Sequence, residues 1–252
     1  MEITEETTGN AGVPAFNPDA VPAHIAVIMD GNGRWAASRG EPRLRGHREG
    51  ARALETVMRA CGDWGVRYLT VYAFSTENWK RPQAEVDGLM ALLGTYLREK
   101  TPELLRDGIC LRAIGDRSRL PDGTRAALAR AEEELAGGGR LTLQLALNYG
   151  GRDEIVRAAR ALARAARAGE IAPEAIDEAA FAARLDTAGV PDPDLLIRTA
   201  GEKRLSNFLP WQLTYAEYYA TPVCWPDFGR AELAAAIAEY QRRTRKFGGL
   251  GK

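Results

Sequence analysis

The fold of this chain is decided by residues 24–36, which read HIAVIMDGNGRWA. The run Ile25–Met29 is continuously apolar, which predicts a parallel strand covered on both faces. Asp30 follows at the carboxyl end of that strand, where open α/β sheets place their ligand sites. Gly31 and Gly33 let a ligand approach the backbone, and the helix start that follows can present amide donors to an anion. The acid and the arginine of this turn together indicate a site for a metal and a phosphate.

Composition excludes several classes of protein. The chain has 252 residues with 34 basic and 34 acidic side chains, so its charge gives no reason to expect nucleic acid as a partner. Its cysteines and histidines are few and scattered, which argues against structural zinc and fits a reducing compartment. These residues are Cys61, Cys110, Cys224, His24 and His47.

The chain shows no targeting or membrane signal. Residues 1–20 are polar and acidic, without the apolar core of a signal peptide, and we expect them to be a disordered lead-in. No stretch approaches about 18 uninterrupted apolar residues, the length that spans a bilayer. We therefore expect a soluble, cytoplasmic protein whose single domain covers residues 21–252.

Helical and strand-like segments alternate along the chain. After the first strand we expect strands at 67–74, 109–114, 141–147 and 195–197, and helices at 46–64, 85–106, 121–135, 153–167, 173–185 and 230–245. The aromatic-rich residues 208–225 fit neither pattern. Strands separated by helices of this length imply right-handed crossovers. The prediction is one α/β domain, with a mostly parallel central sheet flanked by helices.

The glycines of the first turn also fit a dinucleotide-binding motif, GxGxxA, at residues 31–36. That motif requires an acid closing the second strand, about twenty residues on, to hold a ribose. Here that position falls inside a predicted helix near Glu55, and the first acid after the second strand is Glu77. A nicotinamide-dependent oxidoreductase stays open as an alternative, which a change in cofactor fluorescence on titration would reveal.

Two other strand ends carry the same kind of polar side chains. Asp30 alone is also explained as a helix N-cap, and any single charged turn by its solvation. The second strand, however, is followed by Ser75, Glu77, Asn78, Trp79 and Arg81, and the strand at 195–197 by Arg198, Gly201, Glu202, Arg204 and Ser206. Guanidinium forks suit bidentate recognition of phosphate. Glu217, among tyrosines, is either a paired buried charge or an acid facing a metal.

Five separated segments resemble the cis-prenyltransferases, and within them the bacterial undecaprenyl diphosphate synthases. They are HIAVIMDGNGRWA at 24–36, YAFSTENWKRP at 72–82, NYGGR at 148–152, RTAGEKRLSNFLPWQLTYAEYY at 198–219 and WPDF at 225–228. The resemblance covers about residues 22–248 in the family's order and spacing. It implies repeated addition of isopentenyl diphosphate to an allylic diphosphate, typically farnesyl diphosphate, with cis double bonds. It also implies Mg²⁺, a homodimer, and an apolar tunnel between sheet and helices for the growing chain.

The resemblance assigns roles by matching position. Asp30 helps to place Mg²⁺ on the diphosphates, and Glu217 completes the metal site across or near the dimer interface. Asn78 and Ser75 belong to the loop beside the reacting centre. The remaining substrate-binding positions are Asn32, Arg34, Arg43 and His47 around the allylic diphosphate, Gly31, Gly33 and Trp35 in the same turn, Glu77, Trp79 and Arg81 in a closing segment, and Arg198, Arg204 and Ser206 for isopentenyl diphosphate.

Several points stay open at the level of sequence. Ala200 stands where the family often has Gly or Ser, a change that should leave the anion site intact. The tunnel walls we expect, in the helices at 85–106 and 50–61 and at Leu141, are also explained as ordinary core. The basic segment 242–246 is either a solvated helix face or a contact with an anionic membrane. A shorter product, or a non-catalytic subunit of the same fold, remains an alternative.

Overall fold

The computed structural model describes residues 15–244, and within that range seven α-helices accompany six strands. The strands are β1 (His24–Ile28), β2 (Tyr68–Ser75), β3 (Ile109–Ile114), β4 (Leu141–Tyr149), β5 (Leu195–Arg198) and β6 (Glu217–Ala220). The helices are α1 (Asn32–Ala37), α2 (Arg43–Asp63), α3 (Gln83–Arg106), α4 (Asp122–Leu135), α5 (Gly151–Arg167), α6 (Glu178–Ala182) and α7 (Arg230–Gln241).

All six strands belong to one parallel sheet in the order β3-β4-β2-β1-β5-β6. The chain leaves β1 toward β2 on one side and later returns to place β5 on the other side. Such a reversal opens a crevice at the carboxyl ends of the strands. Asp30 follows β1 at this edge, and Arg198, paired with Ile28, ends β5 beside it. The topology therefore brings together polar turns that lie far apart in the sequence.

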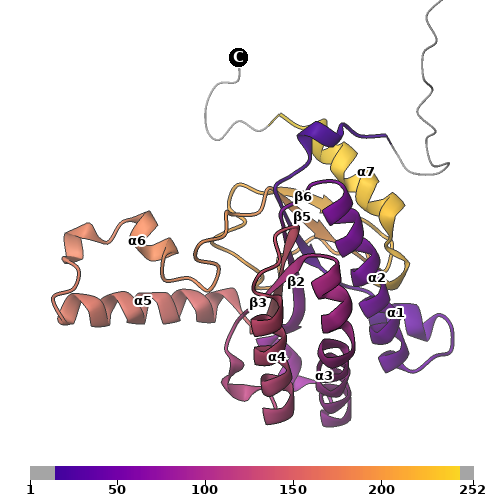
Figure 1. The fold of residues 1–252 in the computed structure, drawn as a ribbon, viewed down its shortest axis with the longest axis horizontal. Coiled ribbons are helices and arrows are strands. Elements are labelled where there is room, and N and C mark those ends of the chain that lie inside the picture. The colour runs from indigo at the N-terminus through magenta and orange to yellow at the C-terminus, as the bar shows by residue number, and fades with distance from the viewer. Residues whose placement is uncertain (1–14, 245–252) are drawn as a thin grey trace, which may run out of the picture.

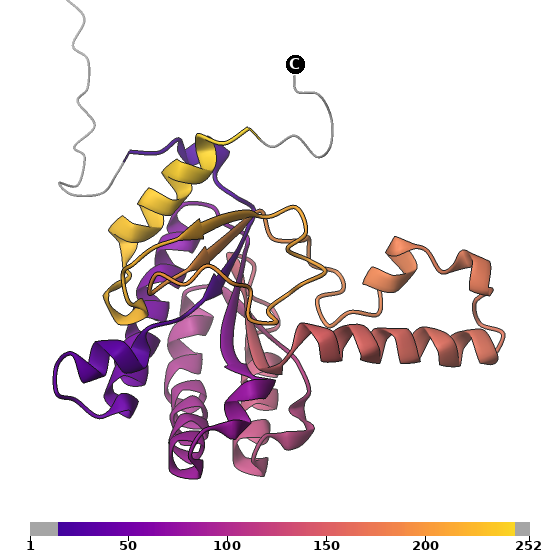
Figure 2. The ribbon, with the colours of Figure 1, turned by 180° about the vertical axis from the view of Figure 1, so that it is seen from behind.

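The two faces of the sheet are covered differently (Figures 1 and 2). Helices α2, α3, α4 and α7 lie on one face and form the main core with strand residues such as Val27, Leu69 and Leu143. The other face is covered mainly by the chain between β5 and β6, through Phe208, Leu209 and Leu213. Helix α5 extends away from the body and carries α6 back alongside it (Figure 1).

A pair of bulges interrupts the β2–β4 ladder near the carboxyl ends of both strands. Tyr72 pairs with Ala146 and Phe74 with Leu147, so Ala73 is an extra residue on β2. One step later, Ser75 pairs with Tyr149, so Asn148 is an extra residue on β4. The two insertions cancel, and the register after them is the register before them. Bulges commonly lie beside active sites, where they redirect a side chain.

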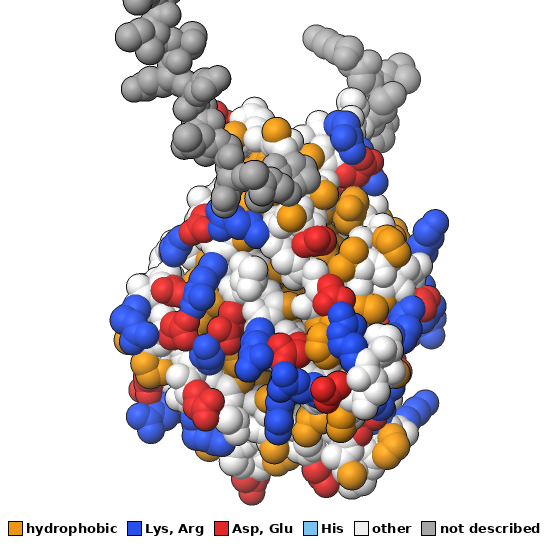
Figure 3. All heavy atoms as spheres, turned by 90° about the vertical axis from the view of Figure 1, so that its right-hand side faces the viewer, with side chains coloured by type: hydrophobic (Ala, Val, Ile, Leu, Met, Phe, Trp, Pro, Cys, Tyr) orange, Lys and Arg blue, Asp and Glu red, His pale blue; other side chains and the backbone are white. Residues whose placement is uncertain are grey.

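The surface carries both signs of charge. Figure 3 shows basic and acidic side chains interspersed over the side of the molecule toward α1, α2 and α7. This agrees with the balance of 34 basic and 34 acidic residues. Within residues 15–244, no helix combines the length and the apolar character needed to cross a bilayer.

The predicted fold class is confirmed, with differences at particular elements. The unassigned stretch 208–225 contains the edge strand β6, which is only four residues long and half-buried, so it lacks a strong alternating pattern. The polar loop after β2 contains a 3₁₀ turn, Thr76–Lys80, and α7 ends at Gln241.

Of the predicted lead-in, residues 1–20, the first 14 lie outside the described residues. The part that is described differs from the prediction: Pro18–Ala20 forms a 3₁₀ turn, and the Gln241 side chain bonds the backbone at Asn17 and Ala20. Pairing with α7 therefore orders the end of this segment.

Candidate active site

A cavity of about 980 Å³ opens at the carboxyl ends of β1, β2 and β5. Five arginines and three carboxylates line it, so its polar end carries an excess of positive charge. The arginines are Arg34, Arg43, Arg81, Arg198 and Arg204, and the carboxylates belong to Asp30, Glu77 and Glu202. Opposite this polar end, leucines of α2 and α3 line the rest of the cavity. The cavity therefore suits a molecule with an anionic head and an apolar tail.

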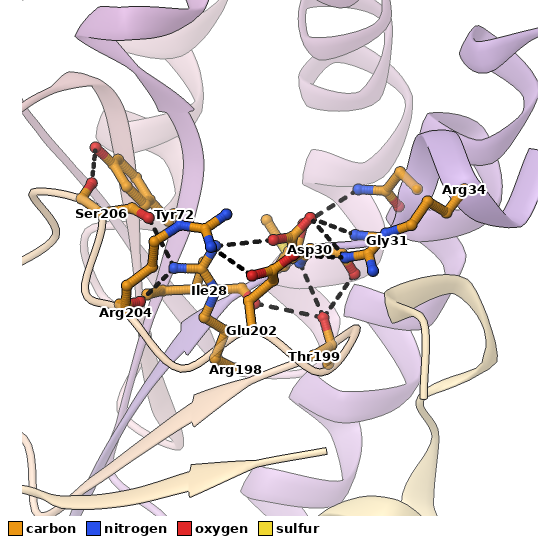
Figure 4. Close-up of polar contacts among 12 residues, drawn as sticks. Ile28, Asp30, Gly31, Arg34, Tyr72, Arg198, Thr199, Glu202, Arg204 and Ser206 are labelled. Atoms are coloured by element: carbon orange, nitrogen blue, oxygen red, sulfur yellow. Dashed lines mark hydrogen bonds and ion pairs between the residues drawn. The ribbon is translucent and has the colours of Figure 1, made fainter. Parts of the chain in front are cut away.

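Asp30 lies at the centre of the polar end (Figure 4). Its Oδ1 accepts a hydrogen bond of 2.7 Å from the Gly31 amide, and its Oδ2 one of 2.9 Å from Arg198 Nη2. The Thr199 hydroxyl accepts from the Asp30 amide and donates to the Asp30 carbonyl, at 2.9 and 2.7 Å. Gly31 has φ +98°, and a Cβ there would lie 2.8 Å from that of Ala200, so the turn needs glycine. The carboxylate is thus fixed from both sides.

A first cluster of anion-binding groups surrounds Arg198. This guanidinium is only 3 % exposed, and its Nη1 donates to Ser206 Oγ at 2.7 Å and to the Arg204 carbonyl. Its Nε is buried without a hydrogen-bond partner. Arg204 is exposed and paired with Glu202, whose other oxygen lies 3.7 Å from Arg34. Figure 4 shows these side chains converging beside Asp30. A desolvated guanidinium with spare donor capacity is suited to phosphate oxygens.

A second cluster lies across the cavity, on α2 and the start of α3. Glu85 accepts from Arg81 at 3.1 Å and pairs with Arg43 at 3.2 Å, which holds both guanidiniums at the rim. His47 lies beside the same carboxylate, with its Nε2 3.9 Å from Glu85 Oε1, buried and without a hydrogen-bond partner. Burial, followed by the charge of Arg81, lowers the pKa of His47 to about 4. A neutral imidazole beside two arginines leaves the anion contact to the arginines and offers a hydrogen bond of its own.

The last residue of β2, Ser75, and two residues of the loop that follows, Glu77 and Asn78, belong to the cavity wall. Asn78 Oδ1 accepts from the Ser75 amide at 3.0 Å, which closes the turn on itself. Burial acts to raise the pKa of Glu77, but hydrogen bonds from Asn207 and its neighbours outweigh it and lower that pKa. Glu77 is therefore an ionised acceptor that ties the loop to the segment after β5, since its Oε1 accepts from Asn207 Nδ2 at 3.0 Å.

Three predicted site residues lie away from the cavity. Trp35 donates to Asp227 Oδ1 at 2.6 Å and stacks under Arg39. Trp79 donates to Asn148 Oδ1 at 2.7 Å. Glu217 lies at the beginning of β6, opposite Leu195, and its carboxylate pairs with Arg243 at 2.9 Å. Asp30, in contrast, follows the carboxyl end of β1. Within one chain Glu217 therefore does not meet Asp30.

The apolar end of the cavity lies between α2, α3 and the sheet. Its lining residues are Ala51, Leu54, Leu89, Leu92, Leu93, Tyr96 and Leu145. Helix α3, expected as a tunnel wall, contributes only part of its apolar side chains to the cavity, since Val86, Met90 and Leu97 are buried in the core. Leu141, expected as a wall, is buried in the core instead. The length and exit of the expected tunnel stay predictions.

Other cavity residues were not singled out from the sequence. Tyr72, Asn207 and Trp225 line the cavity, and buried Thr199 fixes Asp30 from below. All four lie inside the motifs at 72–82, 198–219 and 225–228, so membership of a motif was the available signal. Their residue types alone are equally typical of core or turn positions.

The donor set around Asp30 fits a Mg²⁺ ion that arrives with its substrate. In the part of the chain that the structure describes, no group of three or more His, Cys, Asp or Glu could hold a metal alone. Mg²⁺ commonly takes one or two carboxylates and completes its shell with water and phosphate oxygens. One fixed carboxylate between two arginine clusters is compatible with that pattern.

Comparison with known proteins now adds to this geometry. The family model described as "Putative undecaprenyl diphosphate synthase" matches residues 28–248. The chain belongs to the cis-prenyltransferase family. An isoprenyl transferase of Heliobacterium mobile is 53 % identical over 235 residues, which is 93 % of this chain and 90 % of that protein. One from Agrobacterium fabrum is 49 % identical, over 95 % of this chain and 97 % of the relative.

Solved structures of cis-prenyltransferases share the fold. Lavandulyl diphosphate synthase from Lavandula x intermedia, in complex with dimethylallyl diphosphate, gives a TM-score of 0.88 at 42 % identity and covers 90 % of this chain and 98 % of its own. A probable undecaprenyl diphosphate synthase from Campylobacter jejuni gives 0.75 at 35 % identity with the same coverage. The family predicted from the five motifs is confirmed, and with it an enzyme that transfers prenyl groups.

Proposed function

We propose that this cis-prenyltransferase adds isopentenyl diphosphate repeatedly to farnesyl diphosphate, with cis geometry, and makes undecaprenyl diphosphate for a cell-wall lipid carrier. One observation carries the proposal. Asp30 is fixed between two clusters of anion-binding side chains in a single cavity whose other end is apolar. Two clusters can hold two diphosphates, and the apolar end can receive the prenyl chain of one of them.

The reaction follows from this arrangement. The allylic C–O bond breaks and its electrons leave with the diphosphate, while the double bond of isopentenyl diphosphate forms the new C–C bond and one proton is lost. Arg43 and Arg81 of the second cluster, together with Arg34 from the turn that carries Asp30, stabilise the charge that develops on the leaving diphosphate. Arg198, Arg204 and Ser206 hold the second diphosphate, so that its alkene faces the allylic carbon. Ser75 and Asn78 lie on the wall beside the reacting centre, where Asn78 orients the groups that react.

Mg²⁺ is part of this proposal. When bound, the ion supplies charge that favours departure of the diphosphate. Asp30 is the carboxylate in the cavity that would hold it, because the Gly31 amide and Arg198 fix its orientation without covering every lone pair. Glu217 is the second proposed ligand and would have to reach the site from a second copy of the chain. This assignment links the metal site to a homodimer.

The decisive experiment incubates the protein with farnesyl diphosphate, labelled isopentenyl diphosphate and Mg²⁺. We expect extension products, and chromatography after dephosphorylation should give the undecaprenyl length. Parallel reactions with dimethylallyl diphosphate and with EDTA test the choice of primer and the metal. The absence of extended product with either primer would reject the function, and a shorter product would reject the assigned length.

Two further readings are tested by adding a second chain to this assay and by titrating a nicotinamide cofactor. A non-catalytic subunit would be inactive alone and active after mixing with a second cis-prenyltransferase chain; the intact DGNGR turn and STENW loop argue against it. A nicotinamide enzyme would bind cofactor, which we do not expect because no acid stands where the ribose requires one. We place the protein in the cytoplasm, with peripheral contact to the membrane that receives its product.

A further inference from the structure

Trp79 lies next to Asn78 in sequence, yet its indole is held outside the cavity by three separate contacts. Its Nε1 donates to Asn148 Oδ1 at 2.7 Å. The ring packs edge-on against Phe74, with centroids 5.0 Å apart, and Arg119 lies over its face at 4.6 Å. These contacts come from β2, β4 and the turn after β3. The loop that carries Asn78 is therefore fastened to the sheet through a residue that does not line the cavity.

Asn148 accepts the hydrogen bond from Trp79 while its backbone has an unfavourable conformation. It is 2 % exposed and has φ +46°, a left-handed conformation that residues other than glycine rarely adopt. It is also the extra residue of the β4 bulge. Its amide is used at both ends, because Nδ2 donates to the Asp116 carbonyl at 2.7 Å while Oδ1 accepts from Trp79. A strained residue that binds two neighbouring segments is expected where the geometry of a site depends on it.

We propose that Asn148 is a positioning residue, which through Trp79 holds Ser75 and Asn78 in place on the cavity wall. The hydrogen bond to the indole fixes residue 79, and the bond from the Ser75 amide to Asn78 Oδ1 ties the adjacent Asn78 side chain to the end of β2. Trp79 then acts as an anchor and touches no substrate. This inference rests on the proposed function for its kinetic readout, but the anchoring itself can be measured without turnover.

The experiment uses Trp79→Phe, which keeps a ring and removes the N–H donor, and Asn148→Gly, which keeps the left-handed backbone and removes the amide. Trp64→Phe is the matched control, since Trp64 also packs edge-on against a phenylalanine, Phe16, at 4.8 Å and under an arginine, Arg230, at 4.7 Å. Trp64 is not part of the cavity wall. Hydrogen exchange of the amides at residues 76–81 reports on the loop, and steady-state kinetics report on catalysis.

We expect Trp79→Phe to speed exchange in the loop about tenfold and to lower kcat by about tenfold, the equivalent of one hydrogen bond. The KM of each substrate should change by less than about twofold. Trp64→Phe should change neither readout. In the Asn148→Gly background, Trp79→Phe should have little further effect, because the bond it removes is already lost.

Three results would overturn the proposal. Unchanged exchange in Trp79→Phe would show that the bond holds nothing in place. If the effects of the two substitutions on kcat and on exchange multiply in the double variant, Trp79 and Asn148 act independently of each other. A raised KM for the allylic diphosphate that persists in Asn148→Gly would make Trp79 a substrate contact. If the wild-type chain fails to elongate prenyl chains but Trp79→Phe still speeds hydrogen exchange in the loop, the proposed function is rejected and the anchoring role of Trp79 is supported.

Discussion

Arg198 and Asp30 show how single side chains at this edge of the sheet depend on one another. Arg198 is almost fully buried, and removing a buried charge from water is costly unless a partner compensates for it. Asp30 supplies that partner at 2.9 Å, while its own backbone is fixed by Thr199. The same ion pair that makes the buried guanidinium tolerable also orients the carboxylate. Function and local stability are coupled at this pair.

Replacement of Asp30 should separate the two roles. We expect Asp30→Ala to lower kcat by about a thousandfold, because the carboxylate that organises the leaving diphosphate is lost. The fold should survive, as judged by circular dichroism. Asp30→Asn keeps an acceptor for Arg198 and should be the more stable of the two variants while remaining equally inactive. Near wild-type turnover in either variant would exclude Asp30 as the organiser of the metal.

The corner between α1 and α2 shows how elements set the position of the site. Gly46 lies in α2 against the carbonyl of Asn32, the first residue of α1, and a Cβ at Gly46 would lie 2.0 Å from that oxygen. The two helices can therefore approach closely only because residue 46 is glycine. This contact fixes the start of α1, which directly follows the Asp30–Gly31 turn.

A methyl group at this contact should disturb both fold and activity. We expect Gly46→Ala to destabilise the protein by about 1–3 kcal/mol through overpacking and to reduce activity, because α1 must move. Gly123→Ala is the matched control in α4, where nothing lies within 4 Å of the added Cβ. Alanine should stabilise that helix by about 0.5–1 kcal/mol. Denaturant unfolding of both variants tests the pair, and equal effects at the two positions would contradict the packing argument.

The alternation of helices and strands was sufficient to predict the parallel sheet. The charged and polar side chains that follow three of the strands were sufficient to predict a site at the carboxyl edge of that sheet. Other features depend on where side chains point. The apolar residues of α3 belong partly to the core and partly to the cavity, and helical periodicity does not distinguish Met90 in the core from Leu93 in the cavity. Motif membership likewise predicted Trp79 as a substrate-binding residue, since a sequence does not show that its indole faces Asn148 and lies outside the cavity. Edge strand β6 was missed because four half-buried residues carry no clear period.

The molecule as a whole leaves β6 as an edge of the sheet, with Glu217 at its beginning and Tyr215, 67 % exposed, just before it. This geometry fits the proposal that Glu217 serves a second copy. A parallel edge presents unpaired backbone groups, which are readily covered by another chain. The assignment of Glu217 therefore concerns an assembly, and single-chain variants alone do not test it.

Mixing two inactive variants does test it. We expect Asp30→Ala and Glu217→Gln each to be nearly inactive as purified proteins. After unfolding and refolding together, mixed dimers should contain one site with both native acids, and activity should return to about a quarter of the wild-type level, given random pairing and one competent site per mixed dimer. A mixture that stays as inactive as its components would contradict a site shared between copies.

Stability of the whole chain should depend on pH through its two histidines. Burial lowers the pKa of both His24 and His47 to about 4, whereas an unfolded histidine titrates near 6.5. The unfolded chain therefore binds more protons between pH 6.5 and 4, and the native state loses stability as the pH falls through this window. Each histidine should contribute about 2 kcal/mol of loss between about pH 7 and pH 5.

His24→Gln isolates one of the two contributions. Its amide can still meet Thr70 and the Pro191 carbonyl, which lie 2.8 and 2.6 Å from the imidazole nitrogens. Urea unfolding at both pH values should show a smaller loss of stability in the variant than in the wild type. An identical loss would mean that His24 does not carry the effect.

The paired bulges at Ala73 and Asn148 have a consequence for how this sheet can vary in length. Each strand holds one residue that the ladder leaves unpaired, so deleting either residue alone removes one bulge and leaves the other bulge without its counterpart on the neighbouring strand. Deleting both would restore uninterrupted pairing and remove the loop anchor together with the cavity-facing Ala73. Only a matched pair of deletions would therefore give a regular ladder between β2 and β4, and we expect such a variant to keep the sheet and lose activity.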